Sequence, residues 1–453
     1  MTQQIALRPG DETPLQMLDR TVAELADDPL VHWFETPLSA RRIDLLADGL
    51  AVALQDQGVT RGDRVALYMQ NDPQYLIAML AAWRLGAIIV ACNPMLRRRE
   101  LAHLLEDSKP VAVIALNEIL DTARQAMQHV IGVRVLIGTG ATDLREDCTR
   151  PESDLTPAGV HDLVTLAERH AGAAYDRCAP APENVAVLTY TSGTTGPAKG
   201  AMNTHANIAF VSRLYREWLG IGRADAILGI SPLFHVTGLT AHIGLSLASG
   251  APIVLAHRFD PTVVAGLIER HRATVTVAAI TAYIALANHD AASAHDLSSL
   301  RRPYSGGAPV PPAVVEFLRA RIGLTIRPVY GLTETTGPCH ICPPDIDPPL
   351  DPETGALSVG PAAPLTRARI VGEDGETLEA GEVGEVAVSG PQVVPGYWQR
   401  PEESAAAIRD GELLTGDVGV IDEEGWLYLV DRRKETPTGK ILRRELRDSR
   451  PVT

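Results

Sequence analysis

The chain has 453 residues, of which 45% are hydrophobic and 21% charged, which is ordinary for a soluble globular protein with a large core. It contains 56 acidic residues against 41 Lys and Arg, a formal net charge of −15. Proteins that bind nucleic acids normally carry a basic surplus, so this balance excludes nucleic acid as an expected partner.

The N-terminal region and the cysteines bear on the cellular compartment. The opening residues, MTQQIALRPGDETP, lack the apolar core of a signal peptide. The most apolar window, residues 75–92, is divided by Arg84 and Gly86, which predicts a buried helix, a glycine cap and a strand rather than a transmembrane segment. The 5 cysteines are scattered and odd in number, which favours reduced thiols. We therefore expect a cytoplasmic protein.

Helices and strands alternate along the first three quarters of the chain. Ser39 can cap a helix whose apolar residues keep helical spacing and which Gly58 ends. The pattern predicts further helices that end at Leu85, span 100–108, end at Leu247 and span 261–271, and strands at 64–70, 87–91, 111–116, 226–230, 251–256 and 274–280. Such alternation predicts an α/β fold with largely parallel sheets covered by helices.

The pattern changes after Pro338. Residues 338–355 contain too much proline for the interior of an element and predict a loop. Its CHIC stretch, residues 339–342, is a single CxxC without a second ligand pair, so we interpret these thiols as structural or incidental. Short alternating strands follow at 368–372, 384–390 and 426–431, with turns between them. They predict a small antiparallel unit.

One loop indicates a phosphate site. The apolar strand VAVLTY, residues 185–190, is followed directly by TSGTTGPAKG, residues 191–200. Glycine lets backbone N–H groups approach an anion, the hydroxyls add donors, and Lys199 adds charge. A P-loop would need Gly-Lys-Ser/Thr opening a helix, whereas here Ala198 precedes the lysine and Gly200 follows it. Thr204 can cap a helix over 205–219.

Seven further sequence blocks follow this loop, and together they resemble the motifs of a known protein family. They are SPLFHVTG (231–238), SGGAPV (305–310), YGLTETTG (330–337), GEVGEVAVSGPQVVPGYWQRPEES (381–404), LLTGD (413–417), DRRKE (431–435) and TPTGK (436–440). In these blocks and their order the chain resembles the adenylate-forming superfamily, in its acyl- and aryl-CoA synthetase branch. The resemblance implies a large domain of two largely parallel sheets with packed helices, plus a small distorted antiparallel β unit.

The resemblance also implies a reaction. A carboxylate joins the α-phosphate of ATP with release of pyrophosphate, and the thiol of coenzyme A then takes the acyl group. ATP, Mg²⁺ and coenzyme A are the implied cofactors and co-substrates, and a homodimer is compatible with the family. Acyl-CoA ligase is the first functional hypothesis; the second is an ATP or acyl-adenylate binder with crippled catalysis.

Individual roles follow from the matched motifs. Thr195 and Lys199 would contact the β- and γ-phosphates, and Glu334 would bind the magnesium ion. Asp417 would accept hydrogen bonds from the ribose hydroxyls, and adenine would lie between Tyr330 and a glycine pair. The implied ATP-binding set is Thr191, Ser192, Gly193, Thr194, Thr195, Lys199, Gly306, Gly307, Tyr330, Gly331, Thr333, Asp417 and Arg432. The implied catalytic set is Lys440, Thr195, Glu334 and His235.

His235 bears on the substrate. The peptide-synthetase branch typically has Asp at the matching position, where it pairs with the ammonium group of an amino acid. A buried ammonium without a counter-charge is costly, and histidine offers none. The sequence therefore predicts a fatty or aromatic carboxylic acid. The alternative interpretation of His235 is a core histidine with a satisfied ring.

The last motifs are too close together. Lys434 resembles the family's hinge residue and Lys440 its adenylation lysine, yet Glu435 is followed directly by Thr436. In the family a whole small domain lies between these two motifs. We therefore expect a large domain at 1–431, with 339–430 as its β-rich part, and a hinge with a C-terminal remnant at 432–453.

Overall fold

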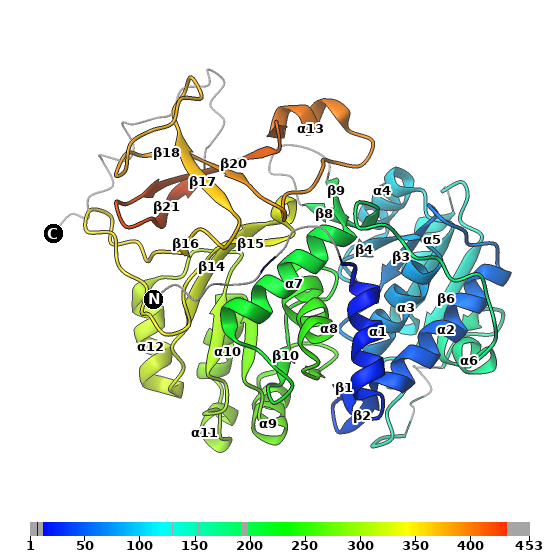
Figure 1. The fold of residues 1–453 in the computed structure, drawn as a ribbon. Coiled ribbons are helices and arrows are strands. Elements are labelled where there is room, and N and C mark those ends of the chain that lie inside the picture. Colours follow the sequence, from blue (N-terminus) through cyan, green and yellow to red (C-terminus); the bar gives the residue numbers. More distant parts are fainter. Residues whose placement is uncertain are drawn as a thin grey trace.

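The structure is a computed structural model that describes residue 7 and residues 12–128, 130–149, 151, 155–191 and 198–432. Three sheets organise this part of the chain (Figure 1). Two are mostly parallel and the third is antiparallel, so the predicted α/β class with a separate antiparallel unit is confirmed at this level. The proposed remnant at 432–453 lies almost entirely outside the described residues.

A seven-stranded sheet has the order β7-β6-β5-β3-β4-β8-β9. Its neighbouring strands are parallel except for the β8–β9 hairpin at one edge. The strands are β3 (Arg64–Tyr68), β4 (Ile88–Cys92), β5 (Ala112–Leu116), β6 (Val135–Thr139), β7 (His161–Asp162), β8 (Val185–Thr191) and β9 (Lys199–Thr204).

Helices cover both faces of this sheet. Alternate strand residues point to opposite faces, so Val65 and Leu67 pack in one core cluster and Ala66 and Tyr68 in another. The first cluster includes α2 (Ala40–Asp56), α3 (Pro73–Arg84) and α6 (Leu163–Arg169), and the second α4 (Arg98–Ser108) and α5 (Leu120–Met127), which follows the short helix η1 (Asn117–Ile119).

An eight-stranded sheet has the order β15-β14-β13-β12-β10-β11-β1-β2 and is parallel except for its two edge pairs. Its strands are β1 (Pro29–Trp33), β2 (Thr36–Ser39), β10 (Ile227–Gly229), β11 (Ile253–Leu255), β12 (Val275–Ala278), β13 (Arg302–Ser305), β14 (Arg327–Leu332) and β15 (Gly337–Ile341). The accompanying helices are α1 (Pro14–Leu25), α7 (His205–Leu219), the π-helix η3 (Gly238–Gly244), α8 (Leu245–Ser249), α9 (Pro261–His271), α10 (Ile280–Ala287), α11 (Ala291–Ala294), α12 (Pro312–Ile322) and the short helix η4 (Thr333–Thr335).

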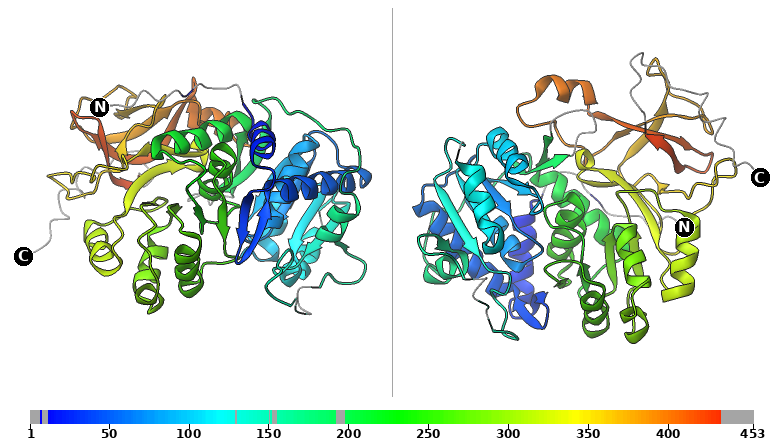
Figure 2. Two further views of the ribbon diagram at one scale, coloured as in Figure 1. Left: turned by 60° about the horizontal axis from the view of Figure 1, so that its bottom comes forward. Right: turned by 180° about the vertical axis from the view of Figure 1, so that it is seen from behind.

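The antiparallel sheet follows in sequence. It consists of β16 (Gly360–Pro361), β17 (Arg367–Val371), β18 (Gly384–Ser389), β19 (Ile408–Arg409), β20 (Glu412–Ile421) and β21 (Trp426–Arg432). Figures 1 and 2 show it against one end of the parallel sheets, with α13 (Pro401–Ala407) near the β8–β9 hairpin. The contact is anchored by a bridge between Ala201 and Tyr397.

Local sequence signals are confirmed at several element ends. The side chain of Ser39 accepts a hydrogen bond from the Arg42 amide at the start of α2, and Thr204 caps α7 in the same way through Asn207. The predicted helix 261–271 coincides with α9. The apolar window at 75–92 is a buried helix, a Gly86 with a φ of +68°, and a strand.

One prediction is wrong in part. Residues 338–341 are not loop, because β15 includes them and pairs antiparallel with β14. Proline is tolerated there because β15 is an edge strand, where an absent N–H need not interrupt a ladder.

Within the described residues, no helix is both long enough and apolar enough to cross a membrane.

Candidate active site

The predicted phosphate loop joins the two strands of an edge hairpin. In the antiparallel pair β8–β9, Thr191 lies opposite Lys199 and Tyr190 opposite Gly200. A Cβ atom at Gly200 would lie 3.1 Å from the Tyr190 ring, so glycine lets this ring pack flat on the neighbouring strand. Ser192, Gly193, Thr194 and Thr195 lie outside the described residues. The structure therefore shows where the loop leaves the sheet and where it returns.

Lys199 and Glu334 are connected through Tyr397. The Lys199 ammonium lies 5.2 Å from the centre of the Tyr397 ring, a cation–π contact. The Tyr397 hydroxyl donates a hydrogen bond of 2.7 Å to Oε1 of Glu334, in η4. Burial, and after it the charge of Glu334, raise the pKa of Tyr397, so the ring remains a neutral phenol that can donate. We call these three residues the Lys–Tyr–Glu cluster.

Backbone and amide contacts hold this cluster in place. The amide of Val394 donates to the carbonyl of Glu334 over 2.9 Å, and that of Trp398 donates to the carbonyl of Gly200 over 2.8 Å. The Asn203 side chain on β9 donates to the carbonyl of Thr333 at 3.2 Å and to the hydroxyl of Thr336 at 2.9 Å. The hairpin, η4 and the turn at 394–398 therefore form one connected unit.

Asp107, in α4, forms hydrogen bonds to two residues next to this unit. Its Oδ2 accepts a hydrogen bond of 2.7 Å from the Tyr190 hydroxyl, and its Oδ1 accepts one of 2.7 Å from the Arg400 guanidinium. The Asp107 side chain is only 9% exposed. Burial and the bond to Asp107 raise the pKa of Tyr190. One carboxylate thus fixes the base of the loop and the turn that carries Tyr397.

The predicted adenine and ribose residues also lie together. The Tyr330 hydroxyl on β14 donates a 2.8 Å hydrogen bond to Oδ2 of Asp417 on β20, and both residues are buried. Burial raises the pKa of Tyr330 well above its ordinary value, so it stays a donor. Gly306 follows β13, and a Cβ there would lie 2.9 Å from the carbonyl oxygen of Val329. Gly307 has a φ of +81°, which favours glycine.

The structure describes some of the remaining predicted site residues and not others. Gly331 lies at the β14–β15 bulge, where a Cβ would be 1.9 Å from the carbonyl oxygen of Gly337, so only glycine fits. Thr333 begins η4 next to Glu334. The backbone of Arg432 pairs with Asp417 at the end of β21. Lys434 and Lys440 lie outside the described residues.

His235 is exposed, in the segment between β10 and η3, so the interpretation as a core histidine is wrong. The Thr237 amide donates to its Nδ1 over 3.3 Å, and the Thr237 hydroxyl lies 3.2 Å from the same atom. Although solvent reaches the ring, the surrounding protein atoms desolvate it and lower its pKa. The ring is therefore neutral near pH 7, with its remaining proton on Nε2.

The CHIC stretch contains two buried thiols. Cys339 and Cys342 are buried, and their thiols donate weakly to the carbonyls of Tyr330 and Ser358, each at 3.5 Å. Burial raises the pKa of Cys342 to about 12. Within the described part of the chain, no three His, Cys, Asp or Glu residues are grouped to hold a metal ion.

Sequence reasoning missed several residues of this region. Tyr397 lies inside a matched block, but nothing local to GYW indicates that its hydroxyl reaches a glutamate 63 residues away. Asp107 lies outside every matched block, and its partners are 83 and 293 residues distant. A carboxylate at the end of an amphipathic helix has the pattern of a solvated surface charge, so no sequence signal was available for it.

Comparisons with known proteins agree with this geometry. A family model described as "AMP-binding enzyme" matches residues 18–398. The chain is 33% identical to a long-chain-fatty-acid–CoA ligase of Bacillus subtilis, over 94% of this chain and 77% of that protein. It is 34% identical to a feruloyl-CoA synthase of an Amycolatopsis species, over 87% of this chain and 73% of that protein.

Solved structures share the fold. The crystal structure of the anthranilate CoA ligase AuaEII with anthranoyl-AMP superposes with a TM-score of 0.84 at 23% identity, over 94% of this chain and 79% of that one. At this identity the likeness shows the fold, while the family match and the curated relatives show the relationship. The chain therefore belongs to the AMP-binding enzyme family, in the acyl-CoA ligase branch of the adenylate-forming superfamily.

Proposed function

We propose that this carboxylate–CoA ligase activates a fatty or aromatic acid with magnesium-bound ATP and transfers the acyl group to coenzyme A. In the first step a carboxylate oxygen bonds to the α-phosphorus and pyrophosphate leaves. In the second, the thiol sulfur of coenzyme A bonds to the acyl carbon, AMP leaves and the thiol proton is lost to solvent. Relatives named for long-chain fatty acids and for ferulate support both substrate classes.

The Lys–Tyr–Glu cluster carries this proposal. Adenylation brings two anions together, so the site must offset negative charge. Lys199 supplies a cation at the return of the phosphate loop, and Glu334 presents a carboxylate oxygen to the same region. Mg²⁺ is commonly held by one or two carboxylates together with substrate phosphates, so Glu334 fits as its protein ligand. The bound ion would neutralise phosphate charge.

The Tyr330–Asp417 pair supports the orientation of the nucleoside. Two adjacent ribose hydroxyls suit one carboxylate, and the hydrogen bond from Tyr330 fixes the orientation of the Asp417 carboxylate. The Tyr330 ring and the Gly306–Gly307 backbone would enclose adenine between an aromatic face and a flat peptide surface.

His235 supports a substrate without an ammonium group. A neutral imidazole offers no negative charge to a cation, whereas its Nε2–H can donate to a carboxylate or acyl oxygen. We propose that His235 lines the acid pocket. A pyrophosphate-exchange panel tests this: fatty or benzoic acids should give a signal and free amino acids should not. A strong signal with an amino acid would contradict the proposal.

The junction of Glu435 and Thr436 favours a second candidate, an ATP or acyl-adenylate binder with weak catalysis. The chain spans about three quarters of the length of the Bacillus subtilis relative, 77%. Lys440 needs a folded support to reach the reacting phosphate. The test follows acyl-AMP and acyl-CoA separately in the 453-residue chain and in Lys440→Ala. Rapid thioester formation that Lys440→Ala abolishes would exclude the second candidate.

A further inference from the structure

Three buried polar side chains lie together at the start of α3. Asn71 is 6% exposed, and Asp72 and Gln74 are 0% exposed. Pro73 between them is the first residue of the helix, a position where its missing N–H costs nothing. Each of the three side chains bonds to a loop after a different parallel strand. In α/β sheets these carboxyl-end loops are where ligands bind.

Asn71 is bonded to the segment that leads to His235. Its Nδ2 donates to the carbonyl of Gly229 at 3.0 Å and to that of Ser231 at 2.8 Å. Its Oδ1 accepts from the Leu233 amide at 2.9 Å. These three bonds use both donors and an acceptor of the amide, which no other side chain of this length offers in the same geometry.

Backbone hydrogen bonds continue from these contacts to His235. The His235 amide donates to the carbonyl of Pro232 over 3.1 Å, and the Leu239 amide donates to the carbonyl of His235 over 2.9 Å. At Gly238 a Cβ would lie 2.1 Å from the Pro232 carbonyl oxygen, so the π-helix packs directly on this turn. A shift of the turn held by Asn71 would therefore move His235 with it.

The neighbouring contacts anchor Asn71 itself. Its backbone amide donates to the carbonyl of His257 over 3.2 Å, and Nδ1 of His257 lies 2.7 Å from Oδ1 of Asp72. His257 and Arg258, which follow β11, face Glu118, which follows β5. The turn before α3 is thus held by groups from both parallel sheets.

We propose that Asn71 is a positioning residue that fixes His235 in the acid pocket, so that its replacement impairs use of the carboxylic acid and leaves ATP binding intact. The inference rests on the proposed role of His235. It predicts a separation of effects, because the Asn71 contacts lie on the β10 segment whereas the nucleotide residues lie on β9, β14 and β20.

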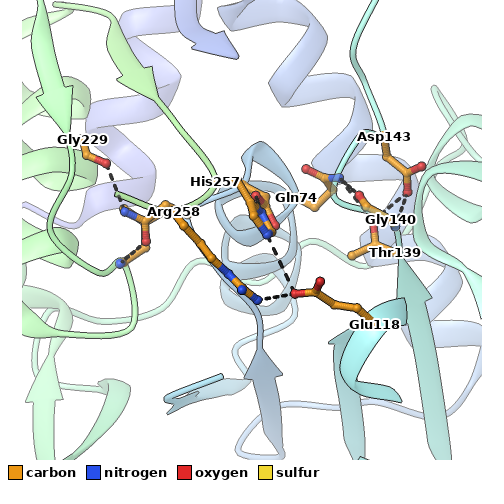
Figure 3. Close-up of polar contacts among 11 residues, drawn as sticks. Gln74, Glu118, Thr139, Gly140, Asp143, Gly229, His257 and Arg258 are labelled. Carbon is orange, nitrogen blue, oxygen red and sulfur yellow. Dashed lines mark hydrogen bonds and ion pairs between the residues drawn. The ribbon is translucent and has the colours of Figure 1, made fainter. Parts of the chain in front are cut away.

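Gln74, in the first turn of α3, provides a matched control three residues from Asn71. Its Nε2 donates to the hydroxyl of Thr139, the last residue of β6, at 3.3 Å and to the carbonyl of Gly140, which follows it, at 3.0 Å (Figure 3). Gln74→Glu and Asn71→Asp make the same isosteric change at two buried positions. In both, an oxygen replaces an NH₂ group that donates to a carbonyl. Only Asn71→Asp disturbs the segment before His235.

Kinetics of acyl-AMP formation give the first test, with Asn71→Ser as a milder variant should Asn71→Asp fold poorly. The kcat/KM for the acid should fall about tenfold or more in the Asn71 variants, because a displacement near 1 Å can cost on the order of a hundredfold in rate. The KM of ATP should stay unchanged, and Gln74→Glu should alter neither constant. Equal effects of Asn71 and Gln74 variants on the acid, or a rise in the KM of ATP by a similar factor, would overturn the inference.

A double-mutant cycle with His235→Ala tests whether Asn71 acts through the imidazole. The Asn71→Ser effect on the acid should largely disappear in the His235→Ala background, because coupled residues are not additive. Full additivity would contradict the inference.

A spectroscopic arm does not depend on activity. In protein labelled at its 13 histidines, the His235 ring signals are assigned by their loss in His235→Ala. The pKa of His235 should rise toward that of an ordinary histidine in Asn71→Ser and remain unchanged in Gln74→Glu. If the wild type makes no acyl-AMP, the proposed function fails, while this arm still decides the inference: an unaltered His235 titration in folded Asn71→Ser overturns it.

Discussion

The hydroxyl of Tyr397 donates a 2.7 Å hydrogen bond to Oε1 of Glu334, although the two residues are 63 positions apart in the chain. The same ring lies under the ammonium of Lys199. A phenol thus holds the carboxylate proposed for Mg²⁺ and the cation proposed for the phosphates in one arrangement. This relationship makes the site testable with substitutions that remove single atoms.

Tyr397→Phe should weaken the use of magnesium-bound ATP. The ring under Lys199 is kept and only the hydroxyl on Glu334 is lost, and a hydrogen bond to a charged group contributes about 1.5–3 kcal/mol. The Mg²⁺ concentration for half-maximal adenylation should rise about tenfold. Tyr428→Phe is the matched control, because its hydroxyl bonds to Asp422 at 3.0 Å within the antiparallel sheet. Equal Mg²⁺ dependence in both variants would refute the role of Tyr397.

Lys199→Ala should lower the affinity for ATP measured by calorimetry, because it removes the cation at the end of the phosphate loop. The loss should shrink as the salt concentration rises, since salt screens charge. Lys109→Ala removes the same charge from the exposed end of α4 and serves as the control. Unchanged ATP affinity in Lys199→Ala would remove the basis for assigning this loop to phosphate.

Asp107→Ala should reduce both stability and ATP affinity. It leaves the partly buried Tyr190 hydroxyl and Arg400 guanidinium without their shared acceptor, and the loss of a hydrogen bond to a charged group costs about 1.5–3 kcal/mol. The control is Asp225→Ala, whose side chain is 11% exposed and pairs with Arg301 and Arg302 away from the loop. Urea unfolding should show a lower free energy of unfolding in both variants, whereas only Asp107→Ala should bind ATP more weakly. If Asp107 had only a structural role, Asp107→Ala and Asp225→Ala would show the same loss of stability and the same ATP affinity.

Acid should destabilise the protein through His32 and His271, whose rings stack with centroids 4.4 Å apart. Burial, and after it the neighbouring His271, lower the pKa of His32 to about 4. Because the folded pKa lies below that of the unfolded chain, the unfolded state binds more protons between about pH 4 and 6.5. The free energy of unfolding should therefore fall as the pH drops through this window.

Urea unfolding at several pH values checks this slope, to which the single proton of His32 contributes at most about 1.4 kcal/mol per pH unit. In His32→Gln the slope should become shallower. The exposed His103→Gln, on α4, should keep the wild-type slope. A wild-type slope in His32→Gln would show that another group causes the acid sensitivity.

Local rules in the sequence were sufficient for helix ends and for the alternation of helices and strands. Ser39 and Thr204 are caps in the structure because a short side-chain oxygen before a helix satisfies an otherwise free amide. The same rules wrongly predicted a loop at 338–341. Proline content indicates local conformation, but it does not indicate whether a strand lies at the edge of a sheet, where proline is tolerated.

The candidate site was predictable only where a motif carries the residue. Lys199, Glu334, Tyr330 and Asp417 were found through their blocks, and the structure brings them together in two pairs. Tyr397, Asp107 and Asn71 act through partners that tertiary folding supplies, 63 to 293 residues away. A buried Asn that bonds three backbone groups has no distinctive spacing, so pattern analysis cannot separate it from a surface residue.

The hairpin that carries the phosphate loop lies at the margin of its sheet. β8 pairs with β4 on its inner side, and β9 is the last strand. Because the two strands run in opposite directions, the chain leaves at Thr191 and re-enters at Lys199 at the same end of the hairpin. Residues can be gained or lost between them without changing the register of any parallel strand. The architecture therefore allows the length of this loop to change independently of the parallel core.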